Sequence, residues 1–535
     1  MSVSDDIHDD DVAAVTYDQD DDSVVVIIGS GASGGTLAYE LAKQGIDVVC
    51  LEAGRRLKVT DFVNDEHAAY DMFTWTDKRT VTGNAAVAKA YPNAPTWVCK
   101  LVGGSTVHWG GLALRWQEHE FKPHSVYGDI AGANLIDWPI SLSDLEPYYA
   151  RAEANMGVSG TNGLPESPKN NNYKVIAHGA RQAGYSKVSN NNWAINPVPY
   201  DGRNACDQIG FCFQGCRSGA KWSTLYVEVP KAEATGHFEL RAECMALQVQ
   251  HDPSGKVSGV LYVDRDGNQH FQKARVVSLA CNAVETARLM LNSASNTFPD
   301  GLANSSGELG RNYIRHVTAL VYGVFDKRVN WHRGMVGQTV VQDEWLHDEK
   351  RGFASGYVMI GFALGLPYYA AFMDPGAWGR SFADKVETYN HVSGIAMTGE
   401  DMPLATNAVT LHPTERDQYG LAIPNLHIDD HENDIKLRNH GVKACTRLYE
   451  AAGATRVIDT PPMPGSHNMG TARMSARPGA GVVNGWGQSH DIANLFVADG
   501  SIFASAAGVN PTLTIVTLAI RQADYIAEAM RKGEL

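Results

Sequence analysis

Residues 24–34 of the chain read Val-Val-Val-Ile-Ile-Gly-Ser-Gly-Ala-Ser-Gly. The opening run is apolar and β-branched, which is typical of a strand buried on both faces. Of the glycines that follow, Gly29 permits a tight turn, Gly31 lets the backbone approach a pyrophosphate, and Gly34 lets a helix pack closely on the strand. The stretch therefore predicts the first strand, turn and helix of a Rossmann-like α/β domain.

The next residues complete a β–α–β unit of about thirty residues. Residues 36–44 have a helical composition and end at Gly45, and residues 47–51 form a second apolar strand that leads into Glu52. An acid at this place can bind the ribose hydroxyl pair of a dinucleotide and disfavours a 2′-phosphate, which argues against NADP. We therefore expect a dinucleotide-binding site, with FAD and NAD both open at this point.

Further elements are expected near the end of the chain. Residues 259–263, 275–280 and 494–498 have strand patterns, and a long helix is expected from Pro511 to about Lys532. Asn510 and Pro511 fit the N-cap and N1 positions of this helix, whose N-terminus would carry a partial positive charge. Residues 317–460 have a mixed pattern from which we assign no elements.

Length and composition bound the class of protein. The chain has 535 residues, more than the roughly 100–200 of one domain, so we expect two closely joined domains. Hydrophobic residues make up 44% and charged residues 20%, which is an ordinary globular composition. The 60 acidic and 45 basic side chains give a net charge of −15, which argues against a nucleic-acid partner.

The N-terminal stretch is acidic. The first 22 residues hold nine aspartates and no Lys or Arg, so we expect residues 1–22 to be a solvated, disordered arm. No basic n-region with an apolar run and no twin-arginine motif is present, which predicts a cytoplasmic protein. The most apolar internal stretch, residues 357–373, is broken by glycines and a proline, so we expect no direct membrane insertion.

Three of the eight cysteines, Cys206, Cys212 and Cys216, lie within eleven residues. Gly210 and Gly215 allow the chain to wrap, and clustered thiolates suit a soft metal centre. Zinc usually takes four ligands in two pairs, and no second pair is present. The three cysteines are therefore candidate metal ligands, the alternative being free or disulfide-paired thiols.

Motifs along most of the chain resemble those of the glucose–methanol–choline (GMC) oxidoreductases. They are Leu51-Glu52-Ala53-Gly54, the run Val102 to Gly111, Leu302 to Ser306 with Gly310-Arg311-Asn312, Ser466 to Met474, Asp499-Gly500-Ser501, and Asn510 to Thr514. The resemblance spans about residues 24–530. Within the family it is closest to bacterial sugar and gluconate dehydrogenase flavin subunits and more distant to pyranose oxidases. It implies a Rossmann-like FAD-binding domain of the GMC type and a mixed-sheet substrate-binding domain.

The resemblance implies FAD as cofactor and hydride transfer from an alcohol carbon to flavin N5. His467 would accept the hydroxyl proton, a task for which an imidazole pKa near neutrality is suited, and Asn510 would position the substrate oxygen. His108 matches a histidine that is covalently attached to the flavin in some relatives and could equally pack beside it. The residues expected to bind the cofactor are Gly29, Gly31, Ser33, Gly34, Glu52, Ala53, Gly104, Ser105, His108, Gly110, Asp499, Gly500, Asn510, Pro511 and Thr512.

The resemblance also bears on electron transfer and location. The spacings of six and four residues between the three cysteines resemble those of sugar-dehydrogenase flavin subunits, where three cysteines hold a 3Fe–4S cluster. Such relatives work with a small subunit and a cytochrome, and some are exported on a partner's signal, so a periplasmic location is also open. The chain departs from the family at Arg315-His316 and at residues 281–287, which puts the flavin contacts of those segments in doubt.

The sequence thus predicts a discontinuous FAD-binding domain (23–125, 225–316 and 465–535), a connecting segment with the cysteines (126–224) and a substrate-binding domain (317–464). The predicted reaction is the FAD-dependent oxidation of a CH–OH group of a sugar, glycoside or polyol, with electrons passed to an external acceptor through the cluster. Two alternatives stay open, an oxidase that reduces dioxygen to peroxide and a non-catalytic flavin electron-transfer module. A carrier would need no proton acceptor such as His467 beside its flavin.

Overall fold

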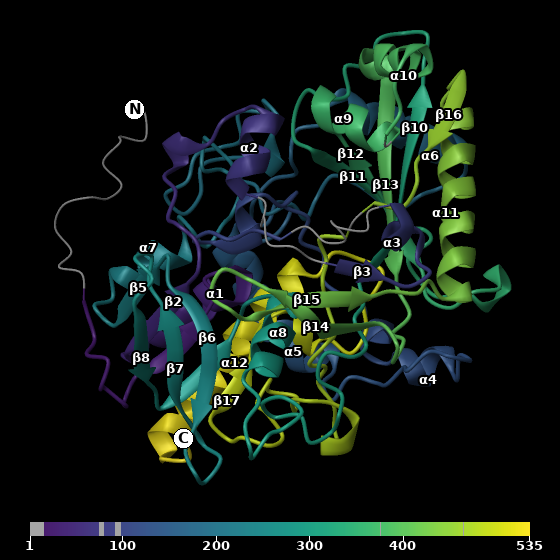
Figure 1. Cartoon of the computed structure of the whole chain (residues 1–535). Coiled ribbons are helices and arrows are strands. Elements are labelled where there is room, and N and C mark those ends of the chain that lie inside the picture. The colour runs from purple at the N-terminus through teal and green to yellow at the C-terminus, as the bar shows by residue number, and fades with distance from the viewer. Residues whose placement is uncertain (1–14, 74–79, 91–97, 375, 464) are drawn as a thin grey trace.

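Two large sheets form two sides of the molecule. The computed structural model describes residues 15–73, 80–90, 98–374, 376–463 and 465–535. In Figure 1 strands β2 and β5 stand at the left, and the green strands β10 to β13 stand at the upper right. The sheet on the left includes the strand that precedes the glycine motif. The sheet on the right is made mostly from residues 317–460, to which we assigned no elements from the sequence.

The predicted first strand is the centre of a five-stranded sheet. β1 (Val25–Ile28) lies between β2 (Val48–Glu52) and β9 (Val276–Leu279), and β5 (Phe238–Ala242) and β17 (Leu495–Val497) are the outer strands. Every pairing is parallel. All four residues of β1 are buried, as a continuous apolar run predicts. The predicted Rossmann-like α/β fold is confirmed.

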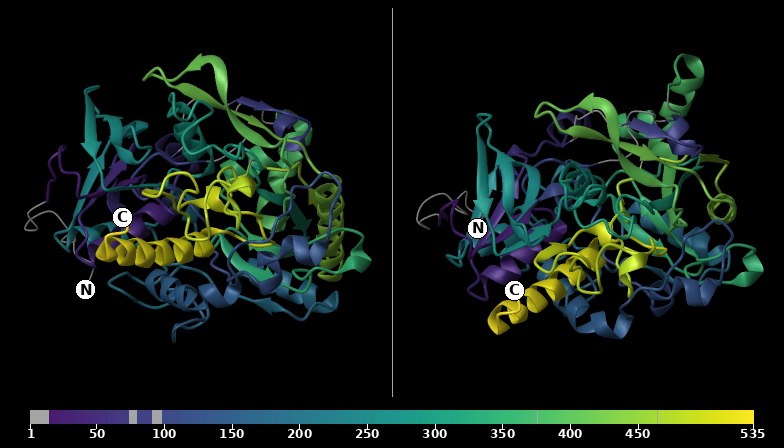
Figure 2. Two further views of the ribbon diagram at one scale, coloured as in Figure 1. Left: turned by 90° about the horizontal axis from the view of Figure 1, so that it is seen from below. Right: turned by 60° about the horizontal axis from the view of Figure 1, so that its bottom comes forward.

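Helices cover this sheet. α1 (Ala32–Ala42) starts directly after the glycine turn, four residues earlier than predicted, and packs against α12 (Thr512–Lys532) and α7 (Glu228–Glu233). α5 (Leu142–Met156) packs on α12, which is the long yellow helix in Figure 2. α8 (Ala283–Asn292) contacts β6 of an antiparallel sheet formed by β6 (Met245–His251), β7 (Val257–Val263) and β8 (Gln269–Lys273).

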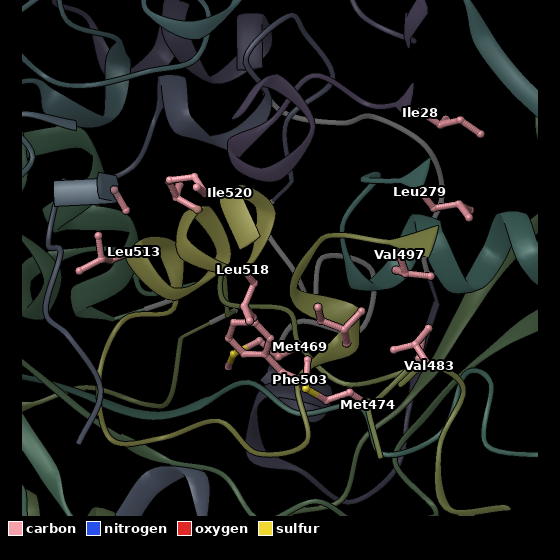
Figure 3. Packing of buried hydrophobic residues seen from close by; sticks show 14 of the residues in the cluster. Ile28, Leu279, Met469, Met474, Val483, Val497, Phe503, Leu513, Leu518 and Ile520 are labelled. Carbon is pink, nitrogen blue, oxygen red and sulfur yellow. The ribbon is translucent and has the colours of Figure 1, made fainter. Parts of the chain in front are cut away.

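The start of α12 differs by one residue from the prediction. Pro511 takes the N-cap position with helical dihedrals, and Thr512 is the first helical residue. Asn510 therefore does not cap the helix. Leu513, Leu518 and Ile520 of α12 belong to the same buried cluster as Ile28, Leu279 and Val497, which lie at strand ends (Figure 3). This packing holds the N-terminus of α12 near the carboxyl edge of the parallel sheet.

The second large sheet has six strands, and each of its pairings is antiparallel. Its order is β16 (Arg456–Asp459), β10 (His316–Val324), β13 (Val392–Glu400), β12 (Tyr357–Phe362), β11 (Gly337–Val341) and β4 (Val188–Ser189). α11 (Glu432–Ala451) and α6 (Asn171–Gln182) pack against it. Because β4 and α6 come from residues 126–224, the expected connecting segment contributes directly to this part of the fold.

A small mixed sheet lies against α8. β14 (Ala408–Arg416) pairs antiparallel with β15 (Ala422–His427), and β15 pairs in parallel with β3 (Thr80–Thr82). The further α-helices of the described residues are α2 (Glu66–Phe73), α3 (Ala86–Ala90), α4 (Pro123–Tyr127), α9 (Leu366–Met373) and α10 (Arg380–Val386). Among the helices that the structure describes, none is long and apolar enough to cross a membrane.

Part of the expected disordered arm is docked on the fold. The Tyr17 hydroxyl donates to Asp47 (2.7 Å), and the Tyr17 N–H donates to Glu239 (2.8 Å). The Lys273 N–H at the end of β8 donates to the Gln19 carbonyl (2.9 Å). Residues 15–22 are therefore held by hydrogen bonds, which corrects the prediction for that part of the arm, whereas residues 1–14 lie outside the described residues.

Candidate active site

A cavity of about 400 Å³ lies between the carboxyl ends of the parallel strands and the six-stranded sheet. Ligands of α/β folds bind at this edge of a parallel sheet. Every predicted catalytic or cofactor-binding residue except Gly34 lines the cavity, namely Gly29, Gly31, Ser33, Glu52, Ala53, Gly104, Ser105, His108, Gly110, His467, Asp499, Gly500, Asn510, Pro511 and Thr512. The structure thus brings together residues that lie far apart in the sequence.

The glycine turn has a backbone and close contacts that leave no room for side chains at two of its positions. Gly29 has a φ of +97°, which favours glycine, and a Cβ at Gly34 would lie 1.8 Å from the Gly29 carbonyl oxygen. Gly34 is therefore outside the cavity because it packs the helix on the turn. On the facing loop, a Cβ at Gly104 would lie 3.0 Å from the Gly31 Cα. Side chains on either residue would narrow the passage between the two loops.

The two predicted acids are buried and accept hydrogen bonds from neighbouring backbone. Glu52 accepts from the N–H groups of Ser30 (3.0 Å) and Gly54 (2.8 Å). Asp499 accepts from the Asn282 N–H (3.0 Å) and the Thr286 hydroxyl (2.5 Å). Burial raises the pKa of both carboxyl groups, against the effect of these hydrogen bonds. Besides lining the cavity, the acids therefore fix the glycine loop and the start of α8.

His467 and Asn510 meet at the cavity wall, and the structure adds His316 as a third member. Asn510 Nδ2 donates to His467 Nε2 (3.2 Å), and the Nδ1 atoms of His467 and His316 lie 2.9 Å apart. Because an amide nitrogen can only donate, His467 Nε2 is the acceptor. The neutral His467 ring then carries its proton on Nδ1 and donates it to His316 Nδ1. The arrangement turns the lone pair of His467 Nε2 toward Asn510.

Burial controls the charge of these rings. It lowers the pKa of His467 to about 4 and lowers the pKa of His316 well below its usual value. Both imidazoles are therefore neutral near pH 7, since the charged form is disfavoured away from water. A neutral imidazole with a lone pair on the cavity side is chemically able to accept a proton.

Lys221 connects the loop of His108 with the cysteine loop. Its buried Nζ donates to the carbonyls of Val107 (2.8 Å), Trp109 (2.9 Å) and Cys212. Burial lowers the pKa of Lys221 to about 8. His108 is itself buried in the cavity wall, and burial together with the Lys221 charge lowers its pKa to about 4. The ammonium is held by carbonyls, and within the described residues no carboxylate forms an ion pair with it.

The three clustered cysteines line a second, smaller cavity together with Lys221. Their thiols are free, and burial raises the pKa of Cys206 to about 12 and that of Cys212 above its usual value. Across the described part of the chain, no group of three or more His, Cys, Asp or Glu side chains is arranged to hold a metal ion. The predicted cluster is therefore not shown by this geometry and stays a prediction from the resemblance.

Comparison with known proteins places the chain in a family. Models of the GMC oxidoreductase family match residues 26–318 and residues 403–519, which together cover most of the chain.

The chain belongs to the GMC oxidoreductase family.

Relatives agree with this assignment, and a solved structure of low sequence identity shares the fold. The chain is 33% identical to 2-methyl-1,2-propanediol dehydrogenase of Mycolicibacterium austroafricanum, over 94% of each chain. It is 29% identical to the fructose dehydrogenase large subunit of Gluconobacter japonicus, over 95% of this chain and 98% of that one. The solved structure of pyridoxine 4-oxidase from Mesorbium loti has a TM-score of 0.66 at 16% identity, with 95% of this chain and 99% of that chain covered. An oxidoreductase acting on CH–OH donors is thus supported.

FAD is the cofactor that the GMC family supports, and the cavity residues fit it. The glycine turn and the facing loop form a backbone cradle for a pyrophosphate, and the N-terminus of α12 opens on the same cavity. His467 and Asn510 line the other part of the cavity, next to the six-stranded sheet. The donor set therefore suits a dinucleotide with a redox ring near these two residues.

The two departures from the family pattern have different consequences. Arg315 turns away from the cavity and is paired with Asp430 (2.7 Å) and Asp401 (3.5 Å). Cys281 and Asn282, by contrast, do line the cavity. The charge of Arg315 is therefore neutralised by two acids, and its side chain does not line the cavity.

Sequence reasoning missed His316 and the cavity wall formed by β10, β12 and β13. In the sequence His316 stands out only as part of a departure from a family pattern, because its contact with His467 joins residues 151 positions apart. The residues of this wall could not be predicted, because both faces of these strands are apolar and the sequence does not indicate which face lines the cavity.

Proposed function

We propose that this GMC oxidoreductase oxidises a CH–OH group of an alcohol, in the range from simple alcohols to the sugars, glycosides and polyols that the resemblance indicated. The observation that carries the proposal is the hydrogen-bonded set of His316, His467 and Asn510 at the cavity wall. A binding or carrier protein has no use for a neutral base whose lone pair faces its ligand site. When bound, FAD supplies the acceptor of the hydride.

The residues of the chain would handle the hydroxyl group. A substrate oxygen that accepts from Asn510 Nδ2 and donates to His467 Nε2 would replace their mutual hydrogen bond (3.2 Å) by two. His467 Nε2 would then take the hydroxyl proton while the carbon loses its hydride, which leaves a carbonyl group. Asn510 would keep the oxygen in place throughout. His316 is a positioning residue in this scheme, because it acts on the ring of His467 and not on the substrate.

The proposal is tested by replacing the base. We expect His467→Ala to lower the rate constant of flavin reduction by about 10²–10⁴, which is the usual contribution of a positioned general base. Rapid mixing of the FAD-loaded variant with substrate in the absence of air measures this step alone. An unchanged rate constant in a variant with full flavin content would rule out His467 as the base.

The electrons are proposed to pass to an external acceptor. The names of the two reported relatives, both dehydrogenases, support this choice, and one of them is a large subunit of its enzyme. A small subunit and a cytochrome are the partners that the resemblance implies. An oxidase of the same fold is the competing function. Formation of one peroxide for each substrate oxidised in air, without an added acceptor, would favour the oxidase.

We further propose that Cys206, Cys212 and Cys216 hold the 3Fe–4S cluster. The support is the convergence of the three thiols on one cavity beside Lys221, whose buried charge would be neutralised by an anionic thiolate centre. A cluster takes one thiolate on each iron, so its sulfur ligands lie farther apart than those of a single ion. The absence of a single-ion site in the described residues is compatible with such a centre. No step of the reaction above depends on it.

We propose His108 as the histidine beside the flavin ring, and acid precipitation tests whether the two are covalently linked. Acid precipitation of the FAD-loaded protein leaves yellow colour in the pellet only when the flavin is covalently attached. If the flavin is covalently attached, His108→Ala should move the colour from the pellet to the supernatant. If it is not, the colour should be in the supernatant for both the wild-type protein and the variant.

A further inference from the structure

One wall of the active-site cavity is a face of the six-stranded sheet. On β10, β12 and β13, one set of alternating side chains packs with α11 in a separate buried cluster that includes Val321, Met359 and Ile395. The other set lines the cavity, as the period of two along a strand requires. The side chains of this cavity wall are Thr318, Leu320, Ile360, Phe362, Ala396 and Thr398.

Strand register arranges these side chains in rows. His316, the partner of His467, is paired with Glu400 at one end of β10. Thr318 and Thr398 form the next row, and Leu320, Ala396 and Ile360 form the row after that. The wall therefore changes from hydrogen-bonding to apolar groups with distance from His316 and His467.

Beyond these rows the side chains that β12 and the segment after it add to the cavity lining are apolar as far as Leu364, and Tyr368 of α9 adds a hydroxyl group. Phe362 packs against Phe213 with ring centres 5.5 Å apart, and Leu364, Val336 and Met463 line the same cavity. Among the six wall residues the hydrogen-bonding side chains are two threonines, and both are in the row next to His316. A sugar has a hydroxyl on almost every carbon, and each hydroxyl buried on an apolar surface without a partner weakens binding.

We propose that the substrate is an alcohol whose reacting CH–OH carbon is attached to an alkyl or aryl body, and that this body lies on Leu320, Ala396, Ile360 and Phe362. The inference deepens the proposed function and rests on it. The hydroxyl lies at the polar end, between His467 and Asn510, and the apolar body points along the strands. Free sugars and polyols of the same size are poor substrates.

The test compares six-carbon alcohols that differ only in the number of hydroxyls. Cyclohexanol is matched with myo-inositol, and 1,2-hexanediol with glucitol, in anaerobic reduction of the FAD-loaded protein. Burial of one methylene group strengthens binding about fourfold. With three or four methylene groups on the wall, the apolar alcohol of each pair is expected to exceed its polyol counterpart by on the order of 10² in the ratio of the flavin-reduction rate constant to the substrate dissociation constant.

A matched pair of variants links this preference to the wall. Ile360→Thr puts a hydroxyl on the cavity face and is expected to lower the apolar preference about fivefold. Ile395→Thr makes the same change on the opposite face of the sheet and should leave the preference within twofold, whatever it does to stability. An unchanged preference in Ile360→Thr would show that the substrate does not lie on this wall.

The outcomes separate this inference from the proposed function. If glucitol or myo-inositol reduces the flavin as well as its apolar counterpart, and His467→Ala stops that reduction, the inference is wrong and the proposed function stands. If none of the four alcohols reduces the flavin of the protein at full cofactor content, the proposed function fails and the inference fails with it.

Discussion

The ionisation of His467 determines the pH range in which the proposed reaction can run. Burial lowers its pKa to about 4, so the ring is neutral and able to accept a proton at higher pH. We expect the rate constant of flavin reduction at saturating substrate to be flat from about pH 6 to 9 and to fall as the pH approaches 4, because a protonated imidazole accepts no proton. A stopped-flow pH profile measures it. A rate that rises through about pH 6.5, the value of a solvated histidine, would contradict this.

His316 is expected to act by fixing the proton of His467 on Nδ1. His316→Leu removes the acceptor for that proton and should lower the rate constant of flavin reduction by on the order of 10². His316→Asn puts an amide oxygen close to the place of the lost Nδ1 and should recover most of the rate. Equal losses in both variants at normal flavin content would mean that the histidine has a structural role only.

The site residues that could be predicted from the sequence are those whose residue type or motif is suited to few roles. Gly29 has the left-handed backbone that only glycine adopts easily, and His467 and Asn510 lie in motifs that resemble a family, so all three were expected and all line the cavity. His316 and Ile360 were not, because a histidine or an isoleucine serves many purposes. Their role depends on what lies across the sheet, which the local sequence does not contain.

At the scale of elements, the loop that contains Asn510 is fixed by hydrogen bonds to the buried carboxyl group of Glu120. Glu120 accepts from the Gly508 N–H (2.8 Å) and from the Trp345 indole N–H (2.8 Å) on one oxygen, and from the Gln117 N–H (2.6 Å) on the other. Burial raises the pKa of Glu120 to about 7. The carboxyl group thus fixes the loop just before α12.

We expect Glu120→Gln to loosen this loop, because the amide replaces one acceptor oxygen with a donor. Loss of buried hydrogen bonds should reduce the free energy of unfolding by about 1–3 kcal/mol, and flavin reduction should slow about tenfold as Asn510 moves. Denaturant unfolding and rapid mixing measure the two effects. Glu118→Gln, in the same turn but exposed with Lys122 as partner, is the control and should change stability by less than about 0.5 kcal/mol.

Element boundaries were predicted well where local signals agree. The β-branched run of β1 and the glycine turn gave the parallel sheet, whereas α12 starts one residue late because Pro511 suits both the N-cap and the first helical position. The strands of the six-stranded sheet were not found. Their pairing is between distant segments such as β10 and β13, and both faces of the strands are buried, which removes the alternating pattern that a strand usually shows.

At the scale of the whole molecule, Lys221 connects the loop of His108 with the loop of the three clustered cysteines. Its buried ammonium donates to carbonyls of both the His108 loop and the cysteine loop, and no carboxylate of the described chain pairs with it. A buried charge without a counter-charge is costly, so an anionic centre at the cysteines would stabilise the fold. The same contact would bring such a centre close to the His108 loop, which we propose lies beside the flavin.

If the electrons leave the flavin through these cysteines, the protein must contain iron. Protein matured with an intact iron–sulfur assembly system and purified without air should contain about three iron atoms per chain, as a 3Fe–4S cluster requires, together with acid-labile sulfide. Cys212→Ser should lose both and keep its flavin, because the glycine turn lies in another part of the fold. Cys445→Ser, at a buried thiol of α11 far from this loop in sequence, should lose neither. Full flavin with no iron in the wild-type protein would contradict the cluster, and the electrons would then have to leave the flavin directly, with dioxygen as the first acceptor to test.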